Sequence, residues 1–348
     1  MTRAAAPPPA AAPAAAADAD PRRADPHESA GGGDRRRTIV VVLALLGNLA
    51  IAVSKGVAAA LTGSSAMASE AVHSLIDTTN EVLLLYGLHR SHVPPDRRHP
   101  FGHDREVYFW SFIVALLIFA LGAGVSAYEG VSRLRDPRPL HAFGVSLAVL
   151  GVAFVFEGIS WIASLRELRR SRGEDGLIAA VRRSKDPSTF TVFLEDSAAL
   201  IGIGLAAAGL LAARLSGRAE FDALASIAIA LLLGATSFFL ARETKGLLIG
   251  EQADPRVHES LLRIAATDPA IAHANGIVTV QLGPERVLAA LSAEFRDELA
   301  APQIEACVTR LERAFADAHP EVSVLFVKPQ ASEVWARRRG ALHGPPPE

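Results

Sequence analysis

The chain has 348 residues, of which half are hydrophobic, with a mean hydropathy of +0.26 and a formal net charge of −2. This balance excludes a strongly basic nucleic-acid-binding protein, and the single cysteine, Cys307, excludes an intrachain disulfide or a cysteine-rich metal site. The hydrophobic residues are gathered in long runs that alternate with short Arg-rich stretches, which indicates a polytopic helical membrane protein in contact with a lipid bilayer.

Residues 1–36 are rich in Ala, Pro and Gly and have no hydrophobic period, so we predict a disordered tail without a signal peptide. Six apolar segments follow, and each exceeds the roughly 20 residues that a helix needs to cross a bilayer. Residues 37–249 are therefore expected to form a six-helix transmembrane domain, with spans at 38–61, 65–88, 107–134, 142–165, 189–215 and 221–248.

The charges of the loops predict the orientation of these spans. The two loops that share a side with the termini, around 90–105 and 166–185, contain eleven Arg and Lys residues, whereas the two opposite loops contain five. Positive loops stay in the cytoplasm, so we expect both termini to be cytoplasmic and the protein to lie in the cell (inner) membrane.

The pattern changes after residue 250, where shorter elements replace the long apolar runs. Residues 255–266 and 302–318 have helical periodicity, and 276–282, 287–296 and 322–327 alternate like strands, with Gly283-Pro284 as a turn. Residues 250–330 are thus expected to form a small cytosolic α+β domain with an antiparallel sheet, followed by a flexible tail over 331–348.

The second span contains a stripe of ionisable residues: Glu70, His73, Asp77 and Glu81. Spacings of three and four place all of them on one helical face, where ionisable groups are costly in lipid and usually mark an ion pathway. An imidazole and a carboxylate one turn apart, His73 and Asp77, supply half of a tetrahedral site for a divalent metal. The alternative is that His73 is a core histidine bonded to a neighbouring carbonyl.

The fifth span contains two adjacent carboxylates, Glu195 and Asp196. Neighbours on a helix point about 100° apart, so both cannot face one ligand equally. One of them is expected to bind metal while the other bonds elsewhere, although both could instead sit at the membrane interface.

The loop between the second and third spans contains Asp96, His99 and His103. One carboxylate and two imidazoles are enough for a three-ligand metal site, and the alternative is a solvated polar loop.

Other polar residues within the spans are left outside the predicted site. We expect Lys55 and Glu129 to pair across the bundle, because unpaired charges there are costly, and Asp222 to cap the sixth helix. Asn48 and Glu157 have no assigned role.

Together these features resemble the cation diffusion facilitator family of zinc/proton antiporters, over residues 38–330. The resemblance rests on the six spans, the Ser69-Glu70-Ala71-x-His73-Ser74-x-x-Asp77 stretch, the His99-Pro100-Phe101-Gly102-His103 loop and the C-terminal α+β domain. Leu194-Glu195-Asp196 is most similar to the branch that includes the mitochondrial zinc transporter of animals and its bacterial relatives.

The resemblance implies a homodimer with one transport site per protomer between the second and fifth spans, to which His73 and Asp77 contribute. Asp96, His99 and His103 match an accessory zinc site in the cytoplasmic loop of bacterial members. The C-terminal domain is similar to the family's ferredoxin-like, metallochaperone-like dimerisation module. Two features depart from the family pattern: the fifth span has no second pair of ligands four residues apart, and the C-terminal domain has no histidine cluster.

We therefore predict proton-coupled efflux of a divalent transition metal, with no enzyme activity. Metal needs neutral imidazole and ionised carboxylates, so protons and metal compete for the same atoms and a proton gradient can drive export. Zn²⁺ fits these ligands, as do Mn²⁺, Fe²⁺ and Co²⁺. The alternatives from other classes are a non-transporting membrane metal sensor and a membrane-embedded metalloenzyme.

Overall fold

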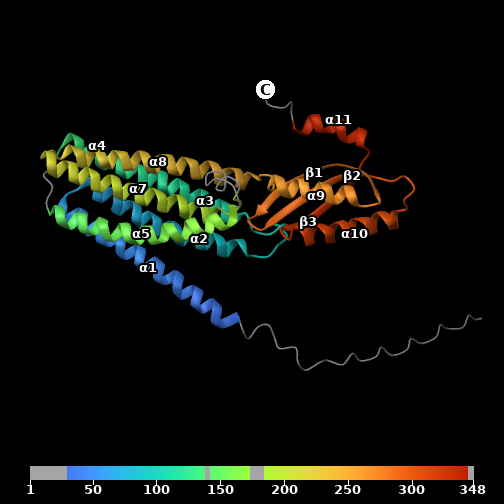
Figure 1. Cartoon of the computed structure of the whole chain (residues 1–348), viewed down its shortest axis with the longest axis horizontal. Helices are drawn as coiled ribbons and strands as arrows, with labels where there is room; N and C mark the ends of the chain where they lie inside the picture. Colours follow the sequence, from blue (N-terminus) through green and yellow to red (C-terminus); the bar gives the residue numbers. More distant parts are fainter. Residues whose placement is uncertain (1–29, 138–141, 173–183, 344–348) are drawn as a thin grey trace, which may run out of the picture. The chain divides into compact units, whose positions relative to one another are not determined.

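The structure is a computed structural model that describes residues 30–137, 142–172 and 184–343. Residues 1–29 of the predicted tail lie outside these ranges, and 30–36 already belong to the first helix. The chain divides into two units, Met1–Ala44 and Leu45–Glu348, and all that follows concerns the second. Figure 1 shows its helical bundle and its smaller α/β domain.

The bundle consists of helices that correspond to the six predicted spans. Glu106–Arg135 is one continuous span because a π-helical turn, η1 (Ile118–Ala123), joins two α-helices. The bundle helices are α1 (Ala30–Thr62), α2 (Ser65–Ser91), α3 (Glu106–Leu117), α4 (Gly124–Arg135), α5 (Phe143–Arg172), α7 (Pro187–Ser216) and α8 (Glu220–Ile249).

In the described part of the chain, five helices are long and apolar enough to cross a membrane, and α2 is the bundle helix that does not qualify. Its ionisable stripe lowers its average hydropathy, although α2 packs against α3, α7 and α8. Large apolar side chains on the outside of the bundle, such as Ile159, Leu231 and Phe238, are more than 60% exposed. An apolar exterior around a polar interior is what a lipid environment selects.

Helices α7 and α8 approach each other closely at Gly209. A Cβ atom at this position would lie 2.4 Å from the Cβ of Ala225 and 3.0 Å from the carbonyl oxygen of Phe221. Small residues at such crossings let two helix backbones pack directly, which is how helices associate in lipid.

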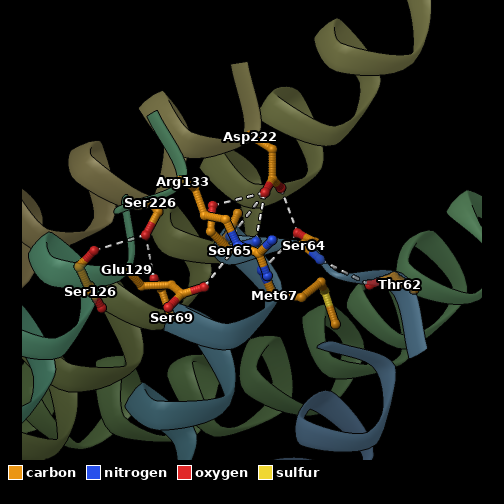
Figure 2. Close-up of polar contacts among 11 residues, drawn as sticks. Thr62, Ser64, Ser65, Met67, Ser69, Ser126, Glu129, Arg133, Asp222 and Ser226 are labelled. Atoms are coloured by element: carbon orange, nitrogen blue, oxygen red, sulfur yellow. Dashed lines mark hydrogen bonds and ion pairs between the residues drawn. The ribbon is translucent and has the colours of Figure 1, made fainter. Parts of the chain in front are cut away.

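Asp222 joins the start of α8 to the start of α2, so the prediction that it caps its own helix is wrong. The N-cap of α8 is Ala219. The buried Asp222 carboxylate instead accepts hydrogen bonds from the Ser64 hydroxyl at 2.5 Å and from the Ser65 backbone N–H at 2.6 Å (Figure 2). These donors belong to the unsatisfied first turn of α2, where a negative charge is favourable.

A chain of serines continues this contact one turn deeper (Figure 2). The hydroxyls of Ser69 on α2 and Ser226 on α8 are 2.6 Å apart, and Ser226 donates to the carbonyl of Ser126 on α4 at 2.9 Å. Three helices are thereby linked by buried polar contacts at one end of the bundle.

Replacing Asp222 with Ala is expected to destabilise the bundle by about 2–4 kcal/mol, because it leaves several buried donors at the start of α2 without an acceptor. Thermal unfolding in detergent measures the effect. Glu220→Ala is the matched control, since Glu220 lies in the same turn of α8 and pairs with the exposed Arg218 at 3.7 Å. Equal melting temperatures for the two variants would show that the Asp222 contacts contribute nothing.

The C-terminal domain contains α9 (Pro255–Thr267), β1 (Ile271–Gly283), β2 (Arg286–Phe295), α10 (Ala301–Ala318) and β3 (Val322–Pro329). The three strands lie in the order β1-β2-β3, and the side chains of Leu261, Leu291, Leu311 and Phe315 form part of the core between the sheet and the helices. This confirms the predicted α+β class of the domain.

The sheet is mixed, so the prediction of an antiparallel sheet is wrong for its last strand. β1 and β2 form the predicted hairpin, with Val280 opposite Leu288. β3 pairs with β2 in parallel, with Val327 opposite Leu291. The cause is α10, which connects the two strands as a crossover and returns the chain to the end at which β2 began.

Residues 332–343 form a further helix, α11 (Ser332–His343), where the sequence predicted a flexible tail. The Ser332 hydroxyl donates to Asn275 on β1 at 2.7 Å, and its backbone N–H donates to Glu294 on β2 at 3.1 Å. These contacts hold the start of the helix to the sheet.

Candidate metal-transport site

The polar stripe of α2 faces the interior of the bundle. Helix α2 starts with an N-cap at Ser64, whose hydroxyl accepts from the Met67 backbone N–H, and this fixes the phase of the stripe. His73 is 1% exposed, and its Nδ1 lies 3.3 Å from Oδ1 of Asp77 one turn later. The predicted pair is therefore brought together on one buried face.

Helix α7 presents Glu195 to this stripe and Asp196 to another helix. The side-chain amide of Asn80 on α2 donates to Oε1 of Glu195 at 2.7 Å. The hydroxyls of Ser160 and Ser164 on α5 both donate to Oδ2 of Asp196, each at 3.0 Å. Both carboxylates are buried, so neither sits at a solvated interface. Glu195 is the member of the pair that is directed toward α2.

A cavity of about 20 Å³ lies between α1, α2, α5 and α7. That volume holds a single water molecule or ion. Five carboxylates contribute to its wall together with three other residues: Asn48, Ser74, Asp77, Glu81, Glu157, Val192, Glu195 and Asp196.

Several buried polar atoms near this cavity have no hydrogen-bond partner among the described residues. They include both ring nitrogens of His73 and Oδ1 of Asp77, of which Nδ1 and Oδ1 lie 3.3 Å apart without forming a hydrogen bond. Buried polar groups nearly always have a hydrogen-bond partner, so unpartnered nitrogen and oxygen atoms on one face indicate that a ligand binds there. Nitrogen and carboxylate oxygen together suit a divalent transition metal.

The two outer members of the stripe are held by α1. Glu81 accepts from the side-chain amide of Asn48 at 2.6 Å and lines the cavity. Glu70 is fully buried, pairs with Lys55 at 3.1 Å, and packs so closely on Gly202 of α7 that a Cβ there would lie 2.3 Å from its Oε1. Glu70 therefore supports the stripe from outside the cavity.

The predicted pairing of Lys55 with Glu129 is wrong. Lys55 contacts residues of α2 and α5, which pack beside α1, whereas Glu129 pairs with Arg133 one turn further along α4 at 3.1 Å. A local i,i+4 partner was available to Glu129, so it needed no contact across the bundle.

Sequence reasoning missed Asn80 and left Glu157 unassigned. Asn80 stands three residues after Asp77 and seven after His73, so the helical period that identified the stripe also places it on that face. Glu157 is a single carboxylate in an apolar helix, and its position at the cavity follows from helix packing that the sequence does not reveal.

The loop between α2 and α3 brings its three predicted residues together. Asp96, His99 and His103 offer ligand atoms within 4.8 Å of one another, and no other group of three such residues in the described chain is so compact. Backbone N–H groups of His99 and Arg98 donate to Asp96, at 2.6 and 2.7 Å, and the His99 hydrogen bond is the main reason why the pKa of Asp96 lies below its ordinary value. His103 is buried and His99 is exposed.

The C-terminal domain contacts the bundle next to this loop. Arg286, at the start of β2, donates to the carboxylate of Asp104 at 2.6 Å, and Lys185 pairs with Glu251 at 2.7 Å. The compact group of metal-ligating side chains found among the described residues does not include His258, His273 or His319 of this domain.

Comparison with known proteins adds an independent result. Residues 41–249 match the model of the cation efflux transmembrane domain. The chain is 36% identical over 228 residues to the mitochondrial proton-coupled zinc antiporter SLC30A9 of Xenopus laevis, covering 65% of this chain and 41% of that protein. It is 32% identical over 212 residues to metal tolerance protein C4 of Arabidopsis thaliana, covering 60% and 46%.

A bacterial relative matches over a longer stretch at lower identity. The cation-efflux pump FieF of Klebsiella pneumoniae is 23% identical over 280 residues, covering 80% of this chain and 88% of that protein. The chain spans less than half the length of the eukaryotic relatives that it matches.

Proposed function

Since the chain belongs to the cation efflux (cation diffusion facilitator) family, whose transmembrane domain covers residues 41–249, we propose that it exports divalent transition-metal cations, zinc first among them, in exchange for protons. It acts as a multi-pass transporter of the cell membrane with both termini in the cytoplasm, works as a homodimer, and is not an enzyme. The membrane domain carries the transport site.

The observation that carries this proposal is the set of buried nitrogen and oxygen atoms in the bundle that have no hydrogen-bond partner among the described residues. His73 and Asp77 on α2 have buried ring nitrogens and a carboxylate oxygen that make no hydrogen bond among the described residues, beside a cavity that Asp77 and Glu195 line. We assign His73, Asp77 and Glu195 as cation ligands, with Asp196 as a neighbouring acid bound to α5 and with Glu70 and Glu81 as supports.

Zinc is our first candidate for two reasons, of which the first separates it from manganese and the second from all three other metals. Imidazole nitrogen is a ligand that zinc shares with cobalt and iron more than with manganese, which prefers oxygen. The SLC30A9 relatives are named as zinc antiporters. The carboxylate-rich cavity wall keeps a manganese, iron or cobalt exporter as the second candidate.

Exchange follows from competition for the same atoms. A cation binds only to neutral imidazole and ionised carboxylate, so its entry releases protons and its departure allows them to return. If α2 and α7 open the cavity alternately to the two sides of the membrane, a proton gradient drives the cation outward.

Reconstitution into proteoliposomes tests the proposal. With a zinc-sensitive dye inside and a pH gradient across the membrane, we expect zinc uptake that stops when a protonophore collapses the gradient. Uptake that ignores the gradient would refute proton coupling, and uptake of manganese, iron or cobalt without zinc would replace the substrate. Metal binding without any flux would favour a sensor.

We also propose that Asp96, His99 and His103 form an accessory metal site in the cytoplasmic loop. Their ligand atoms are already gathered, and an aspartate carboxylate is ionised at neutral pH. Ionised carboxylate and neutral imidazole are what a divalent metal needs.

Replacing His103 with Ala is expected to remove one bound zinc ion per chain or to lower the zinc affinity of that site by at least ~10-fold. The loss of a residue that only supports a metal ligand already lowers metal affinity by about that factor. Equilibrium dialysis of the detergent-solubilised protein measures it. His92→Ala is the control, because His92 caps α2 near the same loop and bonds to the Leu88 carbonyl. Unchanged zinc content in His103→Ala would exclude the loop site.

A further inference from the structure

Lys55 is a fully buried ammonium group beside the transport cavity. It lies on α1 and is 0% exposed. Its Nζ donates to Oε2 of Glu70 at 3.1 Å and to the hydroxyl of Ser74 at 2.7 Å. A buried charge with this many contacts is firmly placed, and ionisable groups at membrane depth usually have a function.

The third neighbour of Lys55 is Glu157 on α5, at 4.0 Å. This distance permits electrostatic attraction but exceeds a hydrogen bond. Glu157 lines the cavity and Glu70 does not. Lys55 therefore contacts one acid outside the cavity and one acid of the cavity wall.

Glu157 differs from the other four carboxylates of the wall in its partners. Glu81 and Glu195 each accept from an amide, Asp196 accepts from two serines, and Asp77 lies against His73. The ion pair with Lys55 is the one contact that the described residues give to the Glu157 carboxylate. Within the described ranges, Lys55 is the basic residue paired with an acid of this five-carboxylate wall.

The positive charge of Lys55 repels a cation that binds in the cavity. Two charges several ångströms apart in a protein interior interact by a few kcal/mol even at an effective dielectric constant of about 20, and the interaction doubles for a divalent ion. An acid-rich cavity without such a charge would bind a divalent cation so tightly that release would limit transport.

We propose that Lys55 is a resident counter-ion of the cavity, which balances Glu157 and lowers the affinity for the transported cation so that the cation can leave. Hydrogen bonds to Glu70 and to Ser74, which lines the cavity, hold the ammonium in place. This inference rests on the transport function proposed above and adds a positioning residue on α1 to the ligands on α2 and α7.

The double variant Lys55→Met/Glu70→Gln tests the inference, because it removes both members of the buried pair and leaves Glu157 as the acid without its positive partner. In proteoliposomes we expect its KM for zinc to fall at least about tenfold and its maximal rate to fall as well, with an unchanged melting temperature. Adding Glu157→Gln removes the unbalanced acid and should return KM toward the wild-type value. Lys55→Arg, which keeps the charge, should retain the wild-type KM.

Each outcome decides the matter. A wild-type KM in a stable double variant would show that Lys55 serves Glu70 alone, and the inference would fail while the proposed function stands. If the wild-type protein transports no metal ion, both the inference and the proposed function are overturned. If the double variant does not fold, Glu157→Gln alone decides, since it removes the wall acid next to Lys55 while Glu70 still holds the ammonium: a raised KM supports the inference, and an unchanged KM overturns it.

Discussion

Replacing Asp77 with Asn is expected to abolish zinc flux in proteoliposomes while the protein stays folded. The amide keeps the size of the side chain but removes the anionic oxygen that lies 3.3 Å from the His73 ring. Losing a charged ligand in a buried site costs about 3 kcal/mol or more, which corresponds to roughly a 100-fold loss of affinity or rate. Flux under an imposed pH gradient and thermal unfolding in detergent measure the two parts of this prediction.

The matched control for Asp77→Asn is Thr79→Ala. Thr79 lies on the same helix, faces outward, and bonds only to the Leu75 carbonyl within its own turn. Its loss should leave flux near the wild-type value. Normal flux in Asp77→Asn would mean that the transported cation does not use the buried pair of α2, and the assigned site would have to be abandoned.

Glu195→Gln should abolish transport, whereas Asp196→Asn should retain most of it. Asn80 of α2 holds Glu195 beside the His73 and Asp77 face, while two serines of α5 occupy Asp196. An amide at Glu195 removes a negative ligand, with a loss of roughly 100-fold. An asparagine at Asp196 still accepts from the serines through its carbonyl oxygen, so we expect a change below about tenfold.

The two acids control each other, because they are adjacent on one helix and both are buried. The comparison therefore uses initial rates of zinc uptake for the two single variants at equal protein density. The reversed ranking, with Asp196→Asn inactive and Glu195→Gln active, would show that Asp196 is the ligand on the fifth span. The transport site would then lie closer to α5.

The sequence predicted what depends on a single helix. His73 and Asp77 were identified because a spacing of four residues places them on one face of α2 wherever that helix packs. The choice between Glu195 and Asp196 depends on which side of α7 meets α2, which is a tertiary contact. The partners of Lys55 and Asp222 were assigned wrongly for the same reason, since both bind residues of other helices.

The C-terminal domain shows the same limit. The hairpin of β1 and β2 was predicted correctly because its turn is local. The direction of β3 was wrong because it depends on where α10 returns the chain, and α11 was missed because its charged sequence has no apolar period that marks a helix. The six spans were visible from length and hydrophobicity alone, although α2 is too polar to qualify when it is considered in isolation.

The polarity of α2 has a consequence for how the protein is made. A helix with this many ionisable side chains partitions poorly from the translocon into lipid, where each charge near the centre costs about 2.5–3.5 kcal/mol. Its predecessor α1 ends at Thr62, with two residues between it and Ser65, and supplies Asn48 for Glu81 and Lys55 for Glu70. The first two helices can therefore enter the bilayer together as a hairpin in which Glu70 and Glu81 already have hydrogen-bond partners. Helix α2, which carries the proposed ligands, would thus insert into the membrane together with α1. The later helices would then pack against this hairpin.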